Sequence, residues 1–152
     1  MKWIRRAAAV AALTFFVSAC ALPRWPVQGP MTSPYGLRFL GWRPDIHEGV
    51  DISAPEGTEV LAMSEGRVSY AGAMAGYGNV VFLRHNTGIV TVYAHLSSIS
   101  VRADQLVDHR QVIGHVGRSG SASGPHLHFE VWMDGRSVDP VMMLGAMPGQ
   151  QR

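Results

Sequence analysis

Short apolar segments recur along the chain from about residue 31 onward, and turns that contain glycine separate them. Several of these segments are rich in β-branched residues, which is typical of strands. The predicted strands are residues 59–63, 67–71, 79–84, 89–95, 112–116 and 126–133. The turns between them contain Gly66, Gly76, Gly78, Asn86-Thr87-Gly88, Gly117, Gly120 and Asp134-Gly135. This pattern predicts an all-β fold, a single domain of antiparallel strands.

Four other stretches do not fit the strand pattern. Residues 97–108 fit neither a strand nor a helix clearly, and residues 139–144 are predicted to form one terminal helical turn at Pro140. Residues 21–30 contain three prolines and no apolar period, so they are predicted to form a short extended tether. The polar tail from residue 146 is predicted to be disordered.

The first nineteen residues have the pattern of a signal sequence. Lys2, Arg5 and Arg6 form a basic start, and an apolar run follows over residues 7–19. A helix that spans a bilayer needs roughly 20 apolar residues, so this run is short for a transmembrane segment. The segment Val17-Ser18-Ala19-Cys20 resembles a bacterial lipobox, in which the cysteine is lipidated. An ordinary secretory signal and an uncleaved anchor are the alternatives.

The lipobox predicts where the protein resides. Cys20 is the only cysteine, so no intramolecular disulfide forms, and Ala21 after it is typical of outer-membrane lipoproteins of Gram-negative cells. We therefore expect a lipid anchor to the membrane on the periplasmic side. The predicted division is a signal peptide (1–19), the lipidated cysteine and tether (20–30), the domain (31–145) and the tail (146–152).

Charge and lysine content exclude two classes of function. The chain has 13 basic and 11 acidic residues, and removal of residues 1–19 deletes three basic residues and no acidic ones, which leaves a net charge of −1. No basic field remains for nucleic acid. Residues 57–68 resemble the hairpins of biotinyl or lipoyl carrier domains. Such carriers need an attachment lysine, and the chain beyond Lys2 has none.

The candidate chemistry lies in three short motifs. If residues 126–133 form a strand, His126 and His128 point to the same side, about 7 Å apart. His47 and Asp51 would be about 13 Å apart on an ideal strand, so they can meet only if the chain bends, and Gly49 is the residue that allows a bend. His95 ends another strand and is expected to share an accessible face with Tyr93.

These motifs, in this order and spacing, resemble those of the LytM/lysostaphin-type zinc metallopeptidases, which cut peptidoglycan cross-links. The resemblance extends over about 110 residues, roughly 31–144, and includes SPYGLR, HEGVDISAPEGTEV, GYGNVVFLRH, TVYAHLS and GPHLHFEVW. It implies the duplicated hybrid motif fold of that family. It also implies that His47, Asp51 and His128 ligate one Zn²⁺ and that His95 and His126 are catalytic. The residues alone leave open which histidine of the HxH pair is a ligand.

The implied site has the composition of a catalytic zinc centre. Three protein ligands leave a fourth tetrahedral position open, which distinguishes a catalytic from a structural zinc site. The chain has no HExxH motif with its glutamate base. His95 and His126 are therefore the candidates for proton transfer and oxyanion stabilisation, and which histidine has which role stays open.

The resemblance implies a peptidoglycan endopeptidase that acts on stem peptides. Many relatives have lost their ligands and activate cell-wall amidases instead, so a catalytically weak lipoprotein that binds and activates an amidase is the alternative. A purely structural lipoprotein that links membrane to wall is a third possibility, and it would need no metal.

The other polar residues near the motifs have simpler expected roles. His85, in a hairpin turn, is expected to be solvated, and neither His109 nor His115 is expected to be catalytic. Glu48 and Glu130 are expected to point away from the ligands, with a supporting role left open. Arg38 is expected to bind a substrate carboxylate or to support the fold. Arg110 replaces a turn glycine of the family, which puts the conformation of that turn in question.

Overall fold

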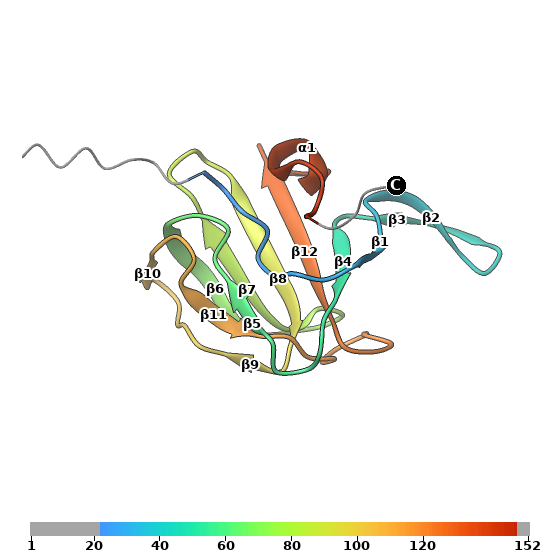
Figure 1. Ribbon diagram of the computed structural model, residues 1–152, viewed down its shortest axis with the longest axis horizontal. Helices are drawn as coiled ribbons and strands as arrows, with labels where there is room; N and C mark the ends of the chain where they lie inside the picture. Colours follow the sequence, from blue (N-terminus) through green and yellow to red (C-terminus); the bar gives the residue numbers. More distant parts are fainter. Residues whose placement is uncertain (1–21, 149–152) are drawn as a thin grey trace, which may run out of the picture.

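The computed structural model describes residues 22–148, and nearly all of the regular structure in this part of the chain is β-strand (Figure 1). The signal peptide and Cys20 lie outside the described residues. The strands are β1 (Met31–Ser33), β2 (Gly36–Leu40), β3 (Arg43–His47), β4 (Val50–Ser53), β5 (Glu59–Leu61), β6 (Gly66–Met74), β7 (Gly78–Arg84), β8 (Val90–Leu96), β9 (Ser98–Ile99), β10 (Leu106–Val107), β11 (Val112–His115), β12 (His126–Met133) and β13 (Arg136–Val138). The helix is α1 (Pro140–Leu144). The all-β prediction is confirmed.

The strands form three sheets, and all of their pairings are antiparallel. The largest has eight strands in the order β1-β4-β12-β8-β7-β6-β10, with β13 paired to β12. A three-stranded sheet has the order β5-β11-β9, and β2 and β3 form a separate hairpin that projects from the body of the domain (Figure 1). Among the described residues, no helix is long and apolar enough to cross a membrane.

The main hydrophobic core contains residues from both the eight-stranded and the three-stranded sheet. Its buried members include Val50, Ile52, Leu83, Leu127 and Phe129 from the first sheet, and Val60 and Ile113 from the second. A smaller apolar cluster of Val80, Val92 and Ala94 is separate from this core. The eight-stranded sheet therefore has the main core on one face and a small apolar cluster of its own side chains on the other.

Strand β12 connects the core with the candidate chemistry through its alternation. Leu127 and Phe129 are fully buried in the core, whereas His126 and His128 lie on the opposite face, as predicted. Strand β4 pairs with β12 so that Asp51 is directly opposite His128. The register of these two strands therefore places a carboxylate beside an imidazole.

The residues before β1 do not form the predicted tether. Trp25 and Val27 are buried in the core, 7% and 4% exposed, and backbone hydrogen bonds join Arg24 to Met63 and Pro26 to Leu61. An extended chain points residues i and i+2 to the same side, so both apolar side chains reach the core despite the surrounding prolines. The domain therefore begins near Arg24 and not at residue 31.

The C-terminal end is also more ordered than the sequence predicts. The predicted turn is present as α1, and Asp139 caps it by accepting a hydrogen bond from the Val141 N–H at 2.9 Å. Met147 is 3% exposed and belongs to the core, so the predicted disordered tail is wrong at this residue. Residues 149–152 lie outside the described part of the chain. In the ambiguous region 97–108, the structure has the short strands β9 and β10.

Candidate metal centre

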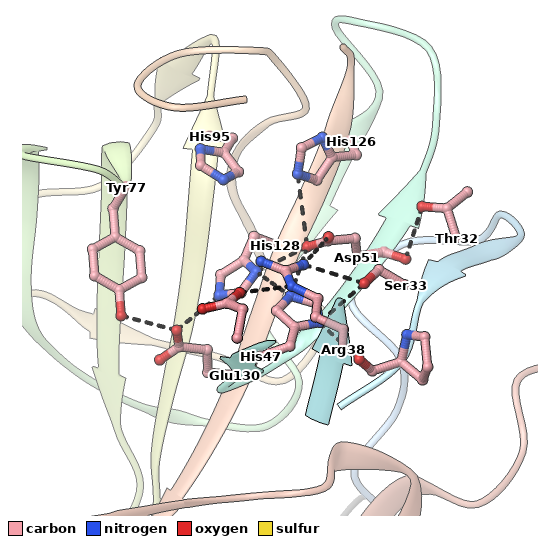
Figure 2. Close-up of polar contacts among 12 residues, drawn as sticks. Thr32, Ser33, Arg38, His47, Asp51, Tyr77, His95, His126, His128 and Glu130 are labelled. Atoms are coloured by element: carbon pink, nitrogen blue, oxygen red, sulfur yellow. Dashed lines mark hydrogen bonds and ion pairs between the residues drawn. The ribbon is translucent and has the colours of Figure 1, made fainter. Parts of the chain in front are cut away.

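Three side chains from three strands converge at one point (Figure 2). His47 Nε2 lies 3.2 Å from Asp51 Oδ1 and 3.1 Å from His128 Nδ1, and His128 Nδ1 lies 2.9 Å from the same Asp51 oxygen. The ligand set implied by the sequence resemblance is thus assembled, although residues 47 and 128 are 81 positions apart.

The predicted bend between His47 and Asp51 is present. Strand β3 ends at His47 and β4 begins at Val50, so the two side chains belong to different sheets. A Cβ atom on Gly49 would lie 2.4 Å from the backbone oxygen of Phe129, which is far inside van der Waals contact. Glycine is therefore required because the turn passes directly over β12.

Backbone and carboxylate acceptors select which nitrogen each ligand histidine presents. His47 Nδ1 donates to the Pro34 carbonyl at 2.7 Å, so Nε2 of the neutral ring is the free acceptor. His128 is arranged the opposite way, because its Nε2 donates to Glu130 Oε1 at 2.7 Å and its Nδ1 faces Asp51, so Nδ1 is the atom that carries the lone pair when the ring is neutral. These assignments give a donor set of two nitrogens and one oxygen.

Glu130 lies on the same face of β12 as His128, so the prediction that it points away from the ligands is wrong. Residues i and i+2 of a strand share a face, and the contact with His128 follows from that spacing. Glu130 also accepts hydrogen bonds from the Tyr77 hydroxyl at 2.9 Å and from Trp132 Nε1 at 2.6 Å. The sequence reasoning did not single out Tyr77 or Trp132, although Tyr77 lies in the GYGN segment of the resemblance.

The cluster is strongly polarised. Burial alone would raise the pKa of Asp51, but hydrogen bonds from His128 and His47 outweigh it and hold that pKa well below its usual range. Burial alone would lower the pKa of His128, and its hydrogen bonds to Asp51 and Glu130 raise it to about 9. A cation at this point would take over the role of the proton that His128 shares with Asp51.

The three donors fit a zinc ion. Tetrahedral ligands at 2.0 to 2.2 Å from Zn²⁺ are about 3.3 to 3.6 Å from one another. The three ligand atoms are 2.9 to 3.2 Å apart, so a shift of a few tenths of an ångström would accommodate the ion. Two imidazoles and one carboxylate are also a common zinc donor set.

His95 and His126 lie next to each other at one end of this cluster (Figure 2), with ring centroids 4.8 Å apart. Nδ1 of His95 donates to the Ser119 carbonyl at 2.9 Å, and Nδ1 of His126 donates to the Gly124 carbonyl at 2.8 Å. Both rings therefore have Nε2 as the free acceptor, and Nε2 of His126 is 3.7 Å from Asp51 Oδ1. Neither ring is among the three converging ligand atoms.

A bulge in β8 places His95 in the site. The sequence reasoning placed His95 on the same face as Tyr93, but Tyr93 is fully buried in the core, and the pairing of β7 with β8 shifts register between these positions. His95 has a positive φ of 62°, which turns its side chain toward His126. Burial lowers the pKa of His95, which keeps the ring neutral at pH 7.

The site opens into a groove of about 500 Å³. Its walls include Arg38, Glu48, Tyr77, Ser121 and Ser123 besides the five site residues. The groove is open to solvent, and charged and hydroxyl side chains line it beside the apolar Leu40, Ala75 and Ile46.

Arg38 supports the site from the hairpin. Its Nε donates to Asp45 Oδ2 at 2.9 Å, and one terminal nitrogen is 3.2 Å from Ser33 Oγ and 3.5 Å from Asp51 Oδ2. Arg38 was expected either to bind a substrate carboxylate or to support the fold, and these contacts favour support of the fold. The guanidinium holds the outer oxygen of Asp51 while the inner oxygen faces the histidines.

The remaining histidines lie outside the site. His85 is 7% exposed and not solvated as expected, since its Nδ1 donates to the Glu65 carbonyl and its Nε2 is 2.9 Å from Thr91 Oγ1. His115 contacts Ser98 Oγ, and neither His109 nor His115 lines the groove. Arg110 has a positive φ of 66°, so it adopts the conformation of the glycine that it replaces, and it donates to the Trp25 carbonyl.

Comparison with known proteins agrees with this geometry. The model of peptidase family M23 matches residues 45–140, which include all five site residues. The DD-carboxypeptidase/endopeptidase Mpg of Neisseria meningitidis is 44% identical over 115 residues, which cover 73% of this chain and 26% of that protein. The murein hydrolase activator NlpD of Escherichia coli is 37% identical over 122 residues, covering 80% of this chain and 31% of NlpD.

A solved structure has the same fold. The catalytic domain of the antimicrobial peptidase lysostaphin from Staphylococcus simulans superimposes with a TM-score of 0.72 at 33% identity, covering 78% of this chain and 93% of that domain. The chain spans about a quarter to a third of the length of the two curated relatives above. On the extent of the family match and the shared fold, the chain belongs to peptidase family M23.

Proposed function

We propose that the protein is a zinc metallopeptidase that hydrolyses peptide cross-links of peptidoglycan. The observation that carries this proposal is the pairing of a three-atom ligand set with two further histidines, both with Nε2 as the free acceptor, in one groove. His47, Asp51 and His128 would hold Zn²⁺. When bound there, Zn²⁺ supplies Lewis-acid chemistry that polarises a carbonyl and lowers the pKa of water from 15.7 toward about 7.

Hydrolysis of the peptide bond forms a C–O bond from water, breaks the C–N bond and moves one proton to the departing amine. His95 and His126 are the groups that move it, because each has an Nε2 free to accept or donate while Nδ1 is tied to a backbone carbonyl. Burial lowers the pKa of His95, so its ring is neutral and the lone pair of Nε2 is available to accept a proton. Once Nε2 of either ring carries a proton, its N–H stabilises negative charge on the carbonyl oxygen.

Incubation of the purified protein with cross-linked muropeptides tests the proposal. We expect cleavage that stops when a chelator is added and returns when zinc is restored, and that is absent in Asp51→Ala. Separation of the products by mass identifies the bond that is cut. A well-folded, zinc-loaded protein that leaves every cross-link intact would contradict the peptidase proposal.

The similarity to NlpD supports a second candidate function, a catalytically weak protein that binds and activates a cell-wall amidase. The five retained polar residues favour the enzyme, because an activator does not need them. The two candidates separate in an assay with an amidase and intact sacculi. If the protein is an activator, wild type and Asp51→Ala stimulate the amidase equally well. If it is an endopeptidase, the release of wall fragments depends on Asp51 and is lost in Asp51→Ala.

We propose that the protein is anchored by lipid at Cys20 and faces the periplasm, with the outer membrane of a Gram-negative cell as its site. The lipobox and the Ala21 that follows it support this proposal. The described domain begins close behind the anchor, which would keep the groove near the membrane and the inner surface of the wall. Expression of Cys20→Ser in place of wild type tests it, since we expect the variant to lose incorporation of labelled fatty acid.

A further inference from the structure

Glu130 is a buried carboxylate, and its hydrogen-bond partners within residues 22–148 are three donors. The side chain is 1% exposed. Its Oε1 accepts from His128 Nε2 at 2.7 Å and from the Tyr77 hydroxyl at 2.9 Å (Figure 2). Its Oε2 accepts from Trp132 Nε1 at 2.6 Å. A buried charge is costly unless it is paired and hydrogen-bonded, so this arrangement needs a reason to be present.

The reason lies in what the carboxylate requires of His128. Tyr77 and Trp132 hold the carboxylate in place as donors, and a carboxylate accepts hydrogen bonds only. The third partner, His128, must therefore present an N–H at Nε2. A neutral imidazole carries one N–H, so Nδ1 is left with its lone pair, and Nδ1 is the atom that faces His47 and Asp51.

We infer that Glu130, held by Tyr77 and Trp132, is the positioning residue that selects Nδ1 of His128 as the metal ligand. This inference rests on the proposed zinc site. Glu130 contacts the ring nitrogen that does not face His47 and Asp51, so it is not a catalytic residue. Its charge also strengthens His128 as a donor to a cation, as hydrogen-bonded carboxylates do for ligating histidines in general.

Glutamine at this position tests the inference because it keeps the size and loses one acceptor. If the amide oxygen of Glu130→Gln faces His128, the amide NH₂ faces the N–H of Trp132, and two donors meet. If the amide turns over, its NH₂ faces Nε2 of His128 and favours the wrong tautomer. Trp132→Phe removes the competing donor, so the double variant allows the amide oxygen to face His128 again.

The measurement is zinc affinity, by competition with a chromophoric chelator on the purified full-length chain. We expect Glu130→Gln to weaken zinc binding about 10- to 100-fold. Glu130→Gln combined with Trp132→Phe should bind zinc more tightly than Glu130→Gln alone, and Trp132→Phe alone should change the affinity less than Glu130→Gln does. A merely structural role predicts the reverse order, since the double variant removes more packing.

Two outcomes overturn the inference: Glu130→Gln that binds zinc as tightly as wild type, and a double variant that binds no tighter than the single one. If Glu130→Gln fails to fold, Tyr77→Phe replaces it, because it removes one donor and leaves the carboxylate; unchanged zinc affinity in that variant also overturns the inference. The assay contains no substrate. Wild type that binds zinc but cleaves no cross-link therefore overturns the proposed peptidase and leaves the inference standing.

Discussion

Every histidine in the site has one nitrogen tied to an acceptor that the fold supplies, and this determines what each ring can do. Three rings donate through Nδ1 to a backbone carbonyl and keep Nε2 free, namely His47, His95 and His126. Only His128 donates through Nε2, to a carboxylate, and keeps Nδ1 free. In the proposed site, the difference between a ligand and a proton carrier therefore lies in where the free nitrogen points and not in the residue type.

This division predicts different effects for the two histidines of the HxH pair. His126→Ala and His95→Ala should each retain zinc and lose about 10²- to 10⁴-fold in turnover, because each removes a proton carrier. His128→Ala should lose the zinc itself. Metal content by atomic spectroscopy, measured beside muropeptide cleavage, distinguishes these results. Loss of zinc from His126→Ala would show that the ligand assignment is wrong.

His85 gives a pH dependence that is independent of the metal. Burial lowers the pKa of His85, and the Glu65 carbonyl only partly offsets this. The unfolded chain, with a pKa near 6.5, thus binds the proton more readily than the folded protein. The stabilisation by neutral His85 is complete above about pH 6.5 and is lost as the pH falls below it.

We therefore expect the difference in free energy of unfolding between wild type and His85→Gln to shrink when the pH is lowered from 8 to 5. Glutamine does not titrate in this range, and the remaining histidines are common to both proteins. Urea unfolding at several pH values measures the difference. A difference that stays constant with pH would contradict a buried neutral ring.

At the scale of elements, the loop 117–124 holds His95 in place through its backbone. The loop packs against the turn before β7, and a Cβ atom on Gly120 would lie 2.4 Å from the nitrogen of Gly78. Gly120 also has a positive φ of 70°. Ser119, beside it, accepts the hydrogen bond from His95 and bonds to Asn79 and Leu96 through its hydroxyl.

Gly120→Ala should therefore destabilise the protein by at least the 1 to 2 kcal/mol or so that a left-handed residue costs, and should lower turnover while zinc stays bound. Gly124→Ala in the same loop is the matched control, because a Cβ atom there meets nothing within 4 Å and the φ is not left-handed. Melting temperature and cleavage rate measure the two effects. If Gly120→Ala and Gly124→Ala have the same melting temperature and cleavage rate, the close contact between Gly120 and Gly78 does not hold His95 in place.

Many of the elements were predictable from local pattern, and their fine placement was not. The longer strands from residue 59 onward, the shared face of His126 and His128 and the bend at Gly49 follow from alternation and from glycine positions, whereas β1 to β4 were not predicted. The bulge that turns His95 toward the site depends on how β8 pairs with β7, which no local pattern encodes. The contacts of Glu130 with Tyr77, 53 residues away, likewise require the folded sheet.

At the scale of the whole molecule, the two ends of the described chain close the core beneath the site. Trp25 packs edge-on against Phe129 of β12, with ring centroids 6.2 Å apart, and its Nε1 donates to the Gly145 carbonyl at 3.2 Å. Phe129 adjoins His128 on the opposite face of the same strand. The burial of Trp25 could not be predicted from the sequence, because the neighbouring prolines interrupt the apolar period without preventing an extended, buried chain.

Trp25→Ala should therefore cost about 3 to 5 kcal/mol of stability, as large-to-small substitutions in a core do. A flexible tether would predict no loss. Leu22→Ala is the control, since Leu22 is 79% exposed in the same segment and should leave the free energy of unfolding unchanged. Urea unfolding of the two variants measures the difference.

Trp25 also packs behind the strand that carries His128. The zinc affinity that remains in Trp25→Ala therefore reports how far the core keeps β12 in register with β4. Equal stability of both variants and wild type would place residues 22–30 outside the folding unit.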